Sequence, residues 1–192
     1  MKSTATYSNQ RVGIFVDVQN LYHSAKNLYR ARVNYAELIK HLVGDRQLIR
    51  AMAYVVKSEG IVETTPHIDR TASHDGDGKS DMSTEAAFFE ALEKAGLELR
   101  MKDLQVWADG AKKADWDVGM AVDAIRMSSF LDVIILVTGD GDFLPLIDYL
   151  KWGAGRVVEV AAFRRSASAK LQEAADTFIS IEDVPRAVMK KR

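Results

Sequence analysis

The chain has 192 residues, of which 47% are hydrophobic and 28% charged, a composition that excludes a fully disordered protein. It contains no cysteine, which excludes a disulfide framework, a thiolate zinc site, an iron–sulfur cluster and a cysteine nucleophile. The net charge of −1 combines an acidic middle, where residues 58–150 carry 19 acidic and 8 basic side chains, with basic flanks at 22–57 and 151–192. We expect folding to place the basic side chains around an acidic pocket.

The two ends of the chain differ in composition from the stretch between them. Residues 1–10 lack the apolar core of a signal peptide, and we interpret them as a flexible tail. Residues 11–183 form one predicted domain, and residues 184–192 form a basic C-terminal tail. No apolar run approaches the ~18 residues that cross a bilayer. We therefore expect a soluble, cytoplasmic protein that does not enter a membrane.

The first predicted elements are strands and helices in alternation. Val12–Val16 is short and uncharged, as buried strands of a parallel sheet are, and a helix is predicted over Asn20–Tyr29 with Asn20 as its N-cap. Asn34 begins the next predicted helix, and Gly44 ends it. A weaker strand signal, Leu48–Val56, follows. This order is typical of α/β proteins.

A long polar segment interrupts this pattern. Ser58–Met82 is rich in Thr, Ser, Asp, Gly and His, and we interpret it as a mobile flap, because loops of this length are usually functional or disordered. A helix is predicted over Ser83–Ala95, ended by Gly96, and a weak strand over Glu98–Lys102. The apolar face of Ala86–Leu92 fits either a second copy of the chain, in a homodimer, or the core of the domain.

The remaining elements continue the alternation to the C-terminus. They are a helix over Trp116–Arg126 with Asp115 as its cap, a strand at Val133–Val137, a helix over Phe143–Trp152 ended by Gly153, a strand at Arg156–Phe163, a helix over Ala167–Ala175 and a weak strand at Phe178–Ile181. The sequence therefore predicts a doubly wound α/β domain with a central, mainly parallel sheet.

Three aspartates follow the strongest strand signals. Asp17 ends the first strand, and Asp140 and Asp142 come just after Val133–Val137. If these strands are neighbours, the carboxylates meet at one edge of the sheet. Carboxylates about 5 Å apart repel by about 3 kcal/mol at an effective dielectric of about 20, so a cluster needs a cation, raised pKa values or solvent. Oxygen ligands favour Mg²⁺ or Mn²⁺. The alternative is that these aspartates form turns or helix caps.

A fourth carboxylate is expected from the central helix. Asp117 lies in its first turn, where the helix dipole alone already favours a negative charge. Asp115 and Asp123 compete with it, although Asp123 is turned about 240° away from Asp117 around the helix. Asp115 is the better candidate for the cap, and the choice between Asp115 and Asp117 stays open.

Several motifs resemble those of the NYN domain, a PIN-like nuclease superfamily that includes the LabA-like bacterial proteins. The matching segments are Gly13–Leu21 (GIFVDVQNL), Lys113–Ala124 (KADWDVGMAVDA), Asp132–Leu146 (DVIILVTGDGDFLPL), Gly153–Val160 and Leu171–Phe178. Together they cover roughly residues 11–183. The resemblance implies a PIN-like three-layer α/β sandwich around a central, mainly parallel sheet. Thr138 and Gly141 stand where the family usually has serine.

The resemblance also implies an activity. The family's acidic positions fall on Asp17, Asp117, Asp140 and Asp142, with Asn20 beside them, and imply a ribonuclease that uses Mg²⁺ or Mn²⁺ to hydrolyse the phosphodiester bonds of RNA, here expected to be single-stranded. The alternatives are a non-catalytic RNA- or protein-binding regulator that retains the acidic pocket, and a small-molecule phosphohydrolase. The usual phosphohydrolase pair of aspartates is absent, since Val18 and Gln19 follow Asp17.

Substrate-binding residues are predicted around this cluster. Asn20 and Thr138 would hold a water or a phosphate oxygen, while Lys113, Arg164 and Arg165 would neutralise backbone phosphates. Each has an ordinary alternative, because Asn20 also suits a helix cap and the basic residues also suit a solvated surface.

Overall fold

The computed structural model describes residues 7–57, 78–103, 105–106, 112–113 and 116–190. The predicted flap lies outside these residues up to position 77, and so does the predicted cap Asp115. From Gly78 the chain is already helical, so the third helix begins earlier than predicted. None of the described helices is long and apolar enough to cross a membrane.

The core of the fold is a six-stranded sheet in which every neighbouring pair is parallel, as predicted. The strands in spatial order are β4 (Glu98–Asp103), β3 (Gln47–Lys57), β1 (Arg11–Asp17), β7 (Val133–Val137), β8 (Val157–Ala162) and β9 (Thr177–Ser180). The chain builds the sheet outward from β1 in one direction and then returns to build from β7 in the other. The strand order therefore reverses between β1 and β7, the place where α/β sheets bind ligands.

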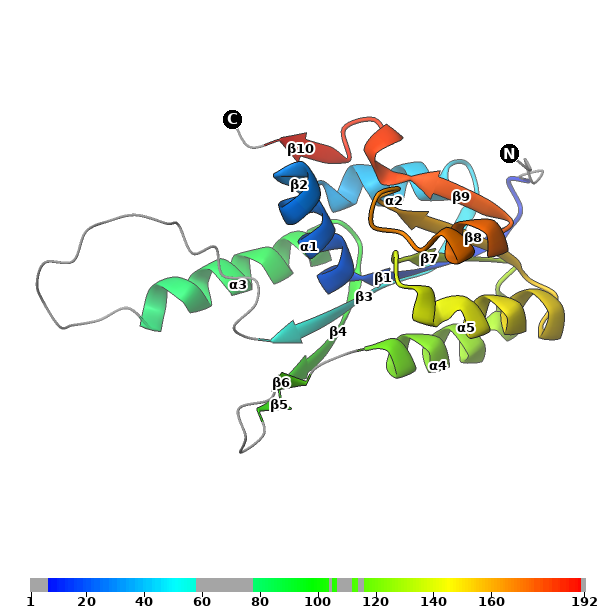
Figure 1. Ribbon diagram of the computed structural model, residues 1–192, viewed down its shortest axis with the longest axis horizontal. Coiled ribbons are helices and arrows are strands. Elements are labelled where there is room, and N and C mark those ends of the chain that lie inside the picture. Colours follow the sequence, from blue (N-terminus) through cyan, green and yellow to red (C-terminus); the bar gives the residue numbers. More distant parts are fainter. Residues whose placement is uncertain (1–6, 58–77, 104, 107–111, 114–115, 191–192) are drawn as a thin grey trace, which may run out of the picture.

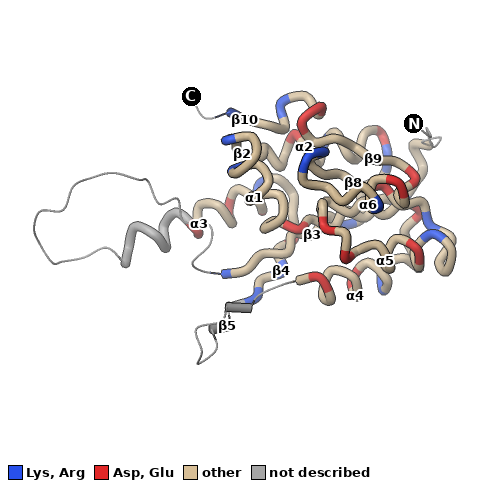
Figure 2. The backbone as a smooth tube through the Cα atoms, viewed as in Figure 1, with Lys and Arg blue, Asp and Glu red and all other residues tan. Residues whose placement is uncertain are grey.

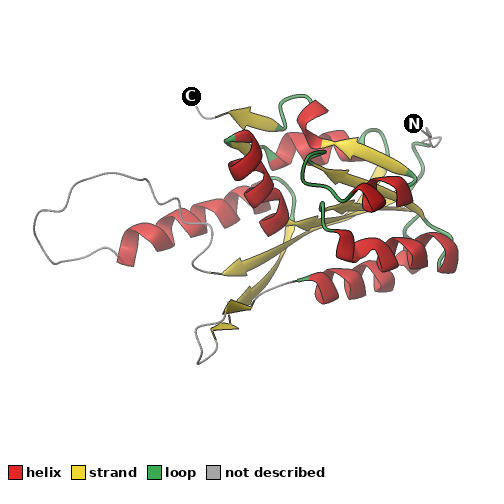
Figure 3. Cartoon of the chain, in the orientation of Figure 1, coloured by secondary structure: helices red, strands yellow, loops and turns green. Residues whose placement is uncertain are grey.

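Helices cover both faces of this sheet and make three layers (Figures 1 and 3). One face carries α1 (Val18–Tyr29), α2 (Tyr35–Val43) and α3 (Gly78–Lys94), and the other carries α4 (Asp117–Met127), α5 (Leu144–Asp148) and α6 (Ala169–Ala174). Within β1, Ile14 and Val16 pack toward the first set, whereas Phe15 packs toward the second. This alternation buries both faces of the strand, which explains its uncharged sequence.

Short elements complete the chain. They are β2 (Ala31–Val33) paired with β10 (Val188–Lys190), β5 (Gln105–Val106) paired with β6 (Lys112–Lys113), the 3₁₀ turns η1 (Ser128–Phe130), η2 (Gly141–Phe143) and η4 (Ile181–Asp183), and the π-helical turn η3 (Tyr149–Gly153). The face predicted for either a dimer or the core packs in part on the core, through Phe88, Phe89 and Leu92. The homodimer stays a prediction.

Two predicted helix boundaries need correction. Asn34 and Gly44 delimit α2 as predicted, but α1 is capped by Asp17, whose carboxylate accepts a hydrogen bond from the Asn20 N–H at 3.1 Å. The helix predicted over Phe143–Trp152 is instead a 3₁₀ turn, α5 and a π turn in succession. Asp140 caps the 3₁₀ turn through its side chain, so the chain turns before α5 begins.

One ion pair is buried between the layers. Arg46, after α2, contacts both carboxylate oxygens of Glu159 on β8, at 2.7 and 3.0 Å, and both side chains are less than 10% exposed. The Nε of Arg46 also donates to the Val43 carbonyl at 3.1 Å. A second pair, between Arg50 and Glu98 at 2.6 Å, is about half exposed and therefore far better hydrated.

We predict that Glu159→Gln lowers the free energy of unfolding by about 3 kcal/mol, because it leaves the buried guanidinium without its counter-charge. The matched change Glu98→Gln, in the exposed pair with Arg50, should cost less than about 1 kcal/mol. Urea unfolding of the three proteins measures the difference. Equal losses in the two variants would contradict the structural role of the buried pair.

A pH effect is predicted at the start of β1. The Asp132 carboxylate accepts hydrogen bonds from the Arg11 side chain and backbone at 2.8–3.0 Å, which lowers the Asp132 pKa to about 2. Because this pKa lies below its unfolded value of about 3.9, the pair stabilises the fold above that pH and loses this contribution as the pH falls toward 2. Between pH 5 and 2, Asp132→Asn should therefore lose less thermal stability than the wild type. Parallel unfolding curves would refute this.

Candidate functional site

The register of β1 and β7 places several polar side chains at one edge of the sheet. Val16 is paired with Val137, so Asp17 and Thr138 both follow the end of this pair. The strands are neighbours, as the predicted convergence of the aspartates requires. On the other side of β1, Asp17 is paired with Tyr54 of β3, which brings Tyr54 to the same edge.

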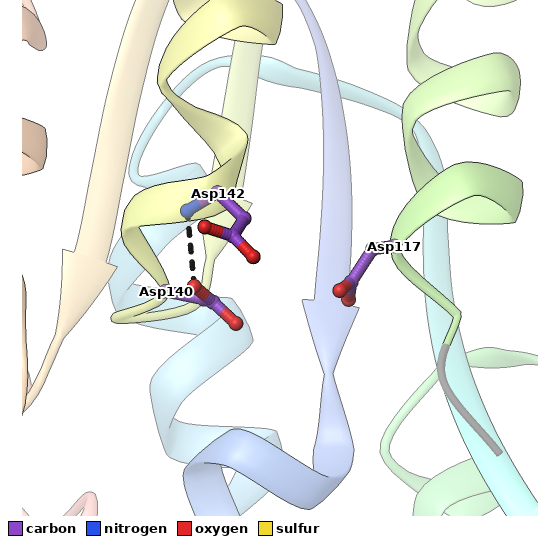
Figure 4. Close-up of side chains that lie close together, drawn as sticks. All are labelled: Asp117, Asp140 and Asp142. Atoms are coloured by element: carbon purple, nitrogen blue, oxygen red, sulfur yellow. Dashed lines mark hydrogen bonds between the residues drawn. The ribbon is translucent and has the colours of Figure 1, made fainter. Parts of the chain in front are cut away.

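Three carboxylates come together at this edge (Figure 4). Asp117, from the first turn of α4, faces Asp140 and Asp142, from the turn after β7, and one oxygen of each lies within 4.8 Å of the others. Asp117 and Asp140 are half-buried and Asp142 is exposed. Two oxygens bound to one Mg²⁺ at about 2.0–2.1 Å lie at most about 4.2 Å apart, so the three carboxylates would have to move closer together to share such an ion. The all-oxygen donor set suits Mg²⁺ or Mn²⁺.

The turn that carries Asp140 and Asp142 is held by local hydrogen bonds. The Asp142 N–H donates to the Asp140 carboxylate at 3.0 Å, and the Asp140 N–H donates to the Thr138 hydroxyl at 3.2 Å. Gly139 lies against the loop after β8, where a Cβ on it would come within 3.1 Å of the Ala167 Cα. A side chain at 139 would press on this loop, so the close approach of the two backbones favours glycine there.

Asp17 is not one of these three, but it lines the same cavity as Asp117 and Asp140. Its carboxylate accepts hydrogen bonds from the Asn20 N–H and the Thr138 hydroxyl, both at 3.1 Å. Burial raises the pKa of Asp17, the two hydrogen bonds partly offset this, and the charge of Asp140 raises the pKa further. Asp17, Asp117 and Asp140 all line one cavity of about 210 Å³. Asp17 thus contributes negative charge to the site while it caps α1.

The predicted substrate-binding residues have different surroundings. Asn20 accepts a hydrogen bond from the Gly139 N–H at 2.9 Å, and Thr138 is fully buried, so both hold the site together. Arg164 and Arg165 are exposed in the loop after β8, and the Arg164 guanidinium lies 3.6 Å from Asp183 and over the ring of Phe178. Lys113 lies in β6, and its side chain is outside the described part of the structure.

Sequence reasoning did not identify four further residues of this cavity. Gln19, His23, Tyr54 and Trp116 line it together with the aspartates. Gln19 and His23 stand four residues apart on the helix that Asp17 caps, a spacing that could have indicated a shared face. Tyr54 and Trp116 could not be found in this way, because they reach the site only through the order of the strands and the packing of α4.

Basic residues also lie at or near the ends of two strands at this edge. Lys57 is the last residue of β3, and Lys102, which pairs with Val56 in the sheet, is close to the end of β4. The Lys102 ammonium lies 5.9 Å from the centre of the Trp116 ring. In Figure 2, basic positions lie at the ends of these strands and acidic ones at the ends of β1 and β7. Of these two lysines only Lys57 belongs to a basic flank of the sequence, so the predicted arrangement of the flanks around the acidic pocket stays a prediction.

Known proteins resemble this chain in sequence and in fold. The family model of the NYN domain matches residues 11–182. The low amplitude and bright protein LabA of Synechococcus elongatus is 26% identical over 125 residues, which are 62% of this chain and 67% of LabA. A crystal structure of a protein of unknown function from Vibrio parahaemolyticus superposes with a TM-score of 0.75 at 28% identity, over 94% of this chain and 98% of its own. The chain therefore belongs to the NYN domain family.

Proposed function

We propose that this protein is a ribonuclease that requires Mg²⁺ or Mn²⁺. The observation that carries the proposal is the convergence of Asp117, Asp140 and Asp142 on one point at the edge of the sheet. Membership of a nuclease-like family supports it, because the same acidic positions lie in the segments that resemble the NYN motifs. A cluster of carboxylates at the end of buried strands costs stability, so a function that needs it is the simplest reason to keep it.

We propose a separate role for each of the described residues of the site. Asp117, Asp140 and Asp142 would hold the cation, and Asp17 would add negative charge from the wall of the same cavity. A bound Mg²⁺ or Mn²⁺ would supply a Lewis acid that neutralises charge on the phosphate and makes a water molecule more acidic. The buried Thr138 hydroxyl links Asp17 to the backbone of Asp140, so the carboxylates keep their positions before substrate arrives.

The substrate we propose is single-stranded RNA. The cavity beside the aspartates is a small recess, so a flexible strand can bring a phosphodiester to it more readily than a rigid duplex. Lys57, at the end of β3, and Lys102, near the end of β4, would neutralise neighbouring phosphates. Arg164 lies beside Asp183 instead, so we assign the approach of the strand to the β3–β4 side.

We predict that the protein cleaves labelled single-stranded RNA in Mn²⁺ or Mg²⁺ and that EDTA abolishes the activity. Asp117→Asn and Asp140→Asn should each lower the rate by about 100-fold or more, because each removes a carboxylate that would hold the cation. Asp148→Asn, the same change at an exposed position of α5, is the control and should leave the rate unchanged. Cleavage that persists in EDTA or in both site variants would sink the proposal. RNA binding without cleavage in every metal would instead support a non-catalytic regulator.

A second prediction concerns stability. In EDTA, Asp140→Asn should unfold at a higher temperature than the wild type, because it removes like-charge repulsion with Asp117 and Asp142. Mn²⁺ at about 100 times its dissociation constant should stabilise the wild type by about 2.7 kcal/mol and the variant much less. Thermal unfolding with and without Mn²⁺ measures both effects. An equal response of the two proteins to Mn²⁺ would place the ion elsewhere.

A further inference from the structure

The indole of Trp116 joins the first turn of α4 to the edge of the sheet. Trp116 is the residue before the helix, and no side chain among the described residues caps this helix end. Its Nε1–H donates to the carbonyl of Val55 on β3 at 2.9 Å, beyond the point where β1 ends beside Tyr54. The Trp116 and Tyr54 rings also meet edge to face, with centroids 5.5 Å apart. The start of α4 is therefore tied directly to the strand end.

A glycine one turn into the helix makes room for this indole. A Cβ on Gly119 would lie 2.6 Å from Cε3 and 2.9 Å from Cζ3 of Trp116. Glycine weakens the interior of a helix, so a better helix former would otherwise be favoured here. Because the ring is also held by Val55 and Tyr54, it cannot move aside without losing one of these contacts.

A second contact ties the same helix to the same strand. The Tyr54 hydroxyl donates to the Asp123 carboxylate at 3.1 Å, and the Arg100 guanidinium lies 3.6 Å from the same oxygen. Met120, between these two attachments, is fully buried in the core. The N-terminal half of α4 is thus fixed at two points on β3, and Asp117 immediately follows the first.

The position of Asp117 depends on the attachment of α4 to β3 more than the positions of the other two aspartates do. Asp140 and Asp142 belong to one turn and are joined by a hydrogen bond, so local structure sets their separation. Asp117 comes from a separate helix, and its distance from them depends on how α4 packs on the sheet. Before a cation binds, repulsion among the three carboxylates favours movement of Asp117 away from the turn.

We propose that Trp116 is a positioning residue that holds Asp117 at the distance from Asp140 and Asp142 at which the three can share a divalent cation. The inference rests on the proposed function, because it assigns to the indole a role in cation affinity. Groups that orient metal ligands commonly change metal affinity by 10-fold or more when they are removed. We therefore expect the loss of the indole contact to lower cation affinity while the ligands themselves remain.

Two variants disturb the contact between the indole and Val55 in different ways. Trp116→Phe keeps an aromatic ring but removes the N–H that donates to Val55. Gly119→Ala keeps the tryptophan but pushes the indole away from its place, and because alanine favours helix, a loss of affinity in this variant cannot come from a weakened helix. Trp152→Phe is the matched control, since Trp152 is 82% exposed on η3. Asp140→Asn reports the cation site itself.

The experiment is a calorimetric titration of each full-length variant with Mn²⁺ at 20 °C, with the unfolding temperature in EDTA measured to show that each is folded. We expect Trp116→Phe and Gly119→Ala to bind Mn²⁺ about 10-fold more weakly than the wild type, Trp152→Phe to bind as the wild type does, and Asp140→Asn to bind far more weakly. If Trp116→Phe is unfolded at 20 °C, the Mn²⁺ affinity of Gly119→Ala alone tests the inference.

The outcomes separate the inference from the function on which it rests. Wild-type affinity in Trp116→Phe and Gly119→Ala, together with weak binding in Asp140→Asn, would overturn the positioning role and leave the proposed cation site intact. Wild-type affinity in Asp140→Asn would overturn both. A lowered unfolding temperature in Trp116→Phe with unchanged Mn²⁺ affinity would make Trp116 a purely structural residue, which also overturns the inference.

Discussion

The parallel pairing of β1 with β7 is the constraint on which the site depends. With Val16 beside Val137, the chain places Asp17 and Thr138 together and sends the Asp140–Asp142 turn out over the same edge. Both strands are covered by helices on both faces, so the carboxylates that they carry cannot separate without unpacking the core. The sheet therefore holds like charges close together, and the stability that this costs comes from burial elsewhere in the domain.

A network of hydrogen bonds within the site offsets part of the stability that is lost by holding these carboxylates close together. The Thr138 hydroxyl donates to Asp17 and accepts from the Asp140 N–H, while Asn20 accepts from the Gly139 N–H. Through these bonds the start of α1 and the turn after β7 become one unit. Asp17 accepts two hydrogen bonds without joining the outer three carboxylates, and these bonds offset part of the rise in its pKa that burial causes. When ionised, its carboxylate would add to the attraction of a cation at the outer three.

The strands, and the position of Asp17, Asp140 and Asp142 at one edge of the sheet, were predictable from the sequence because both follow from local pattern and a general rule. That Asp117 and not Asp17 completes the group of three did not follow from this rule, because it depends on how α4 packs on the sheet. Val133–Val137 is apolar on both faces, and ligand-binding residues collect at the ends of such strands. The partners of Asn20 and Trp116 were not predictable, because their hydrogen bonds join residues 119 and 61 positions apart. The sequence predicted Asn20 as the N-cap of α1. Instead, the Asp17 carboxylate at the strand end accepts a hydrogen bond from the Asn20 N–H and caps the helix.

The proposed function makes two opposing demands on the charges at this edge of the sheet. The edge would have to collect carboxylates for a cation and yet admit a polyanion, and these demands conflict unless the two kinds of charge are placed apart. The acidic groups occupy the ends of β1 and β7 and the start of α4, whereas Lys57 and Lys102 occupy the ends of β3 and β4. Trp116 stands between the two sets, with its indole beneath Lys102 and its backbone leading into Asp117. A cation that neutralised the carboxylates would then leave the basic side of the edge as the dominant charge that an approaching strand meets.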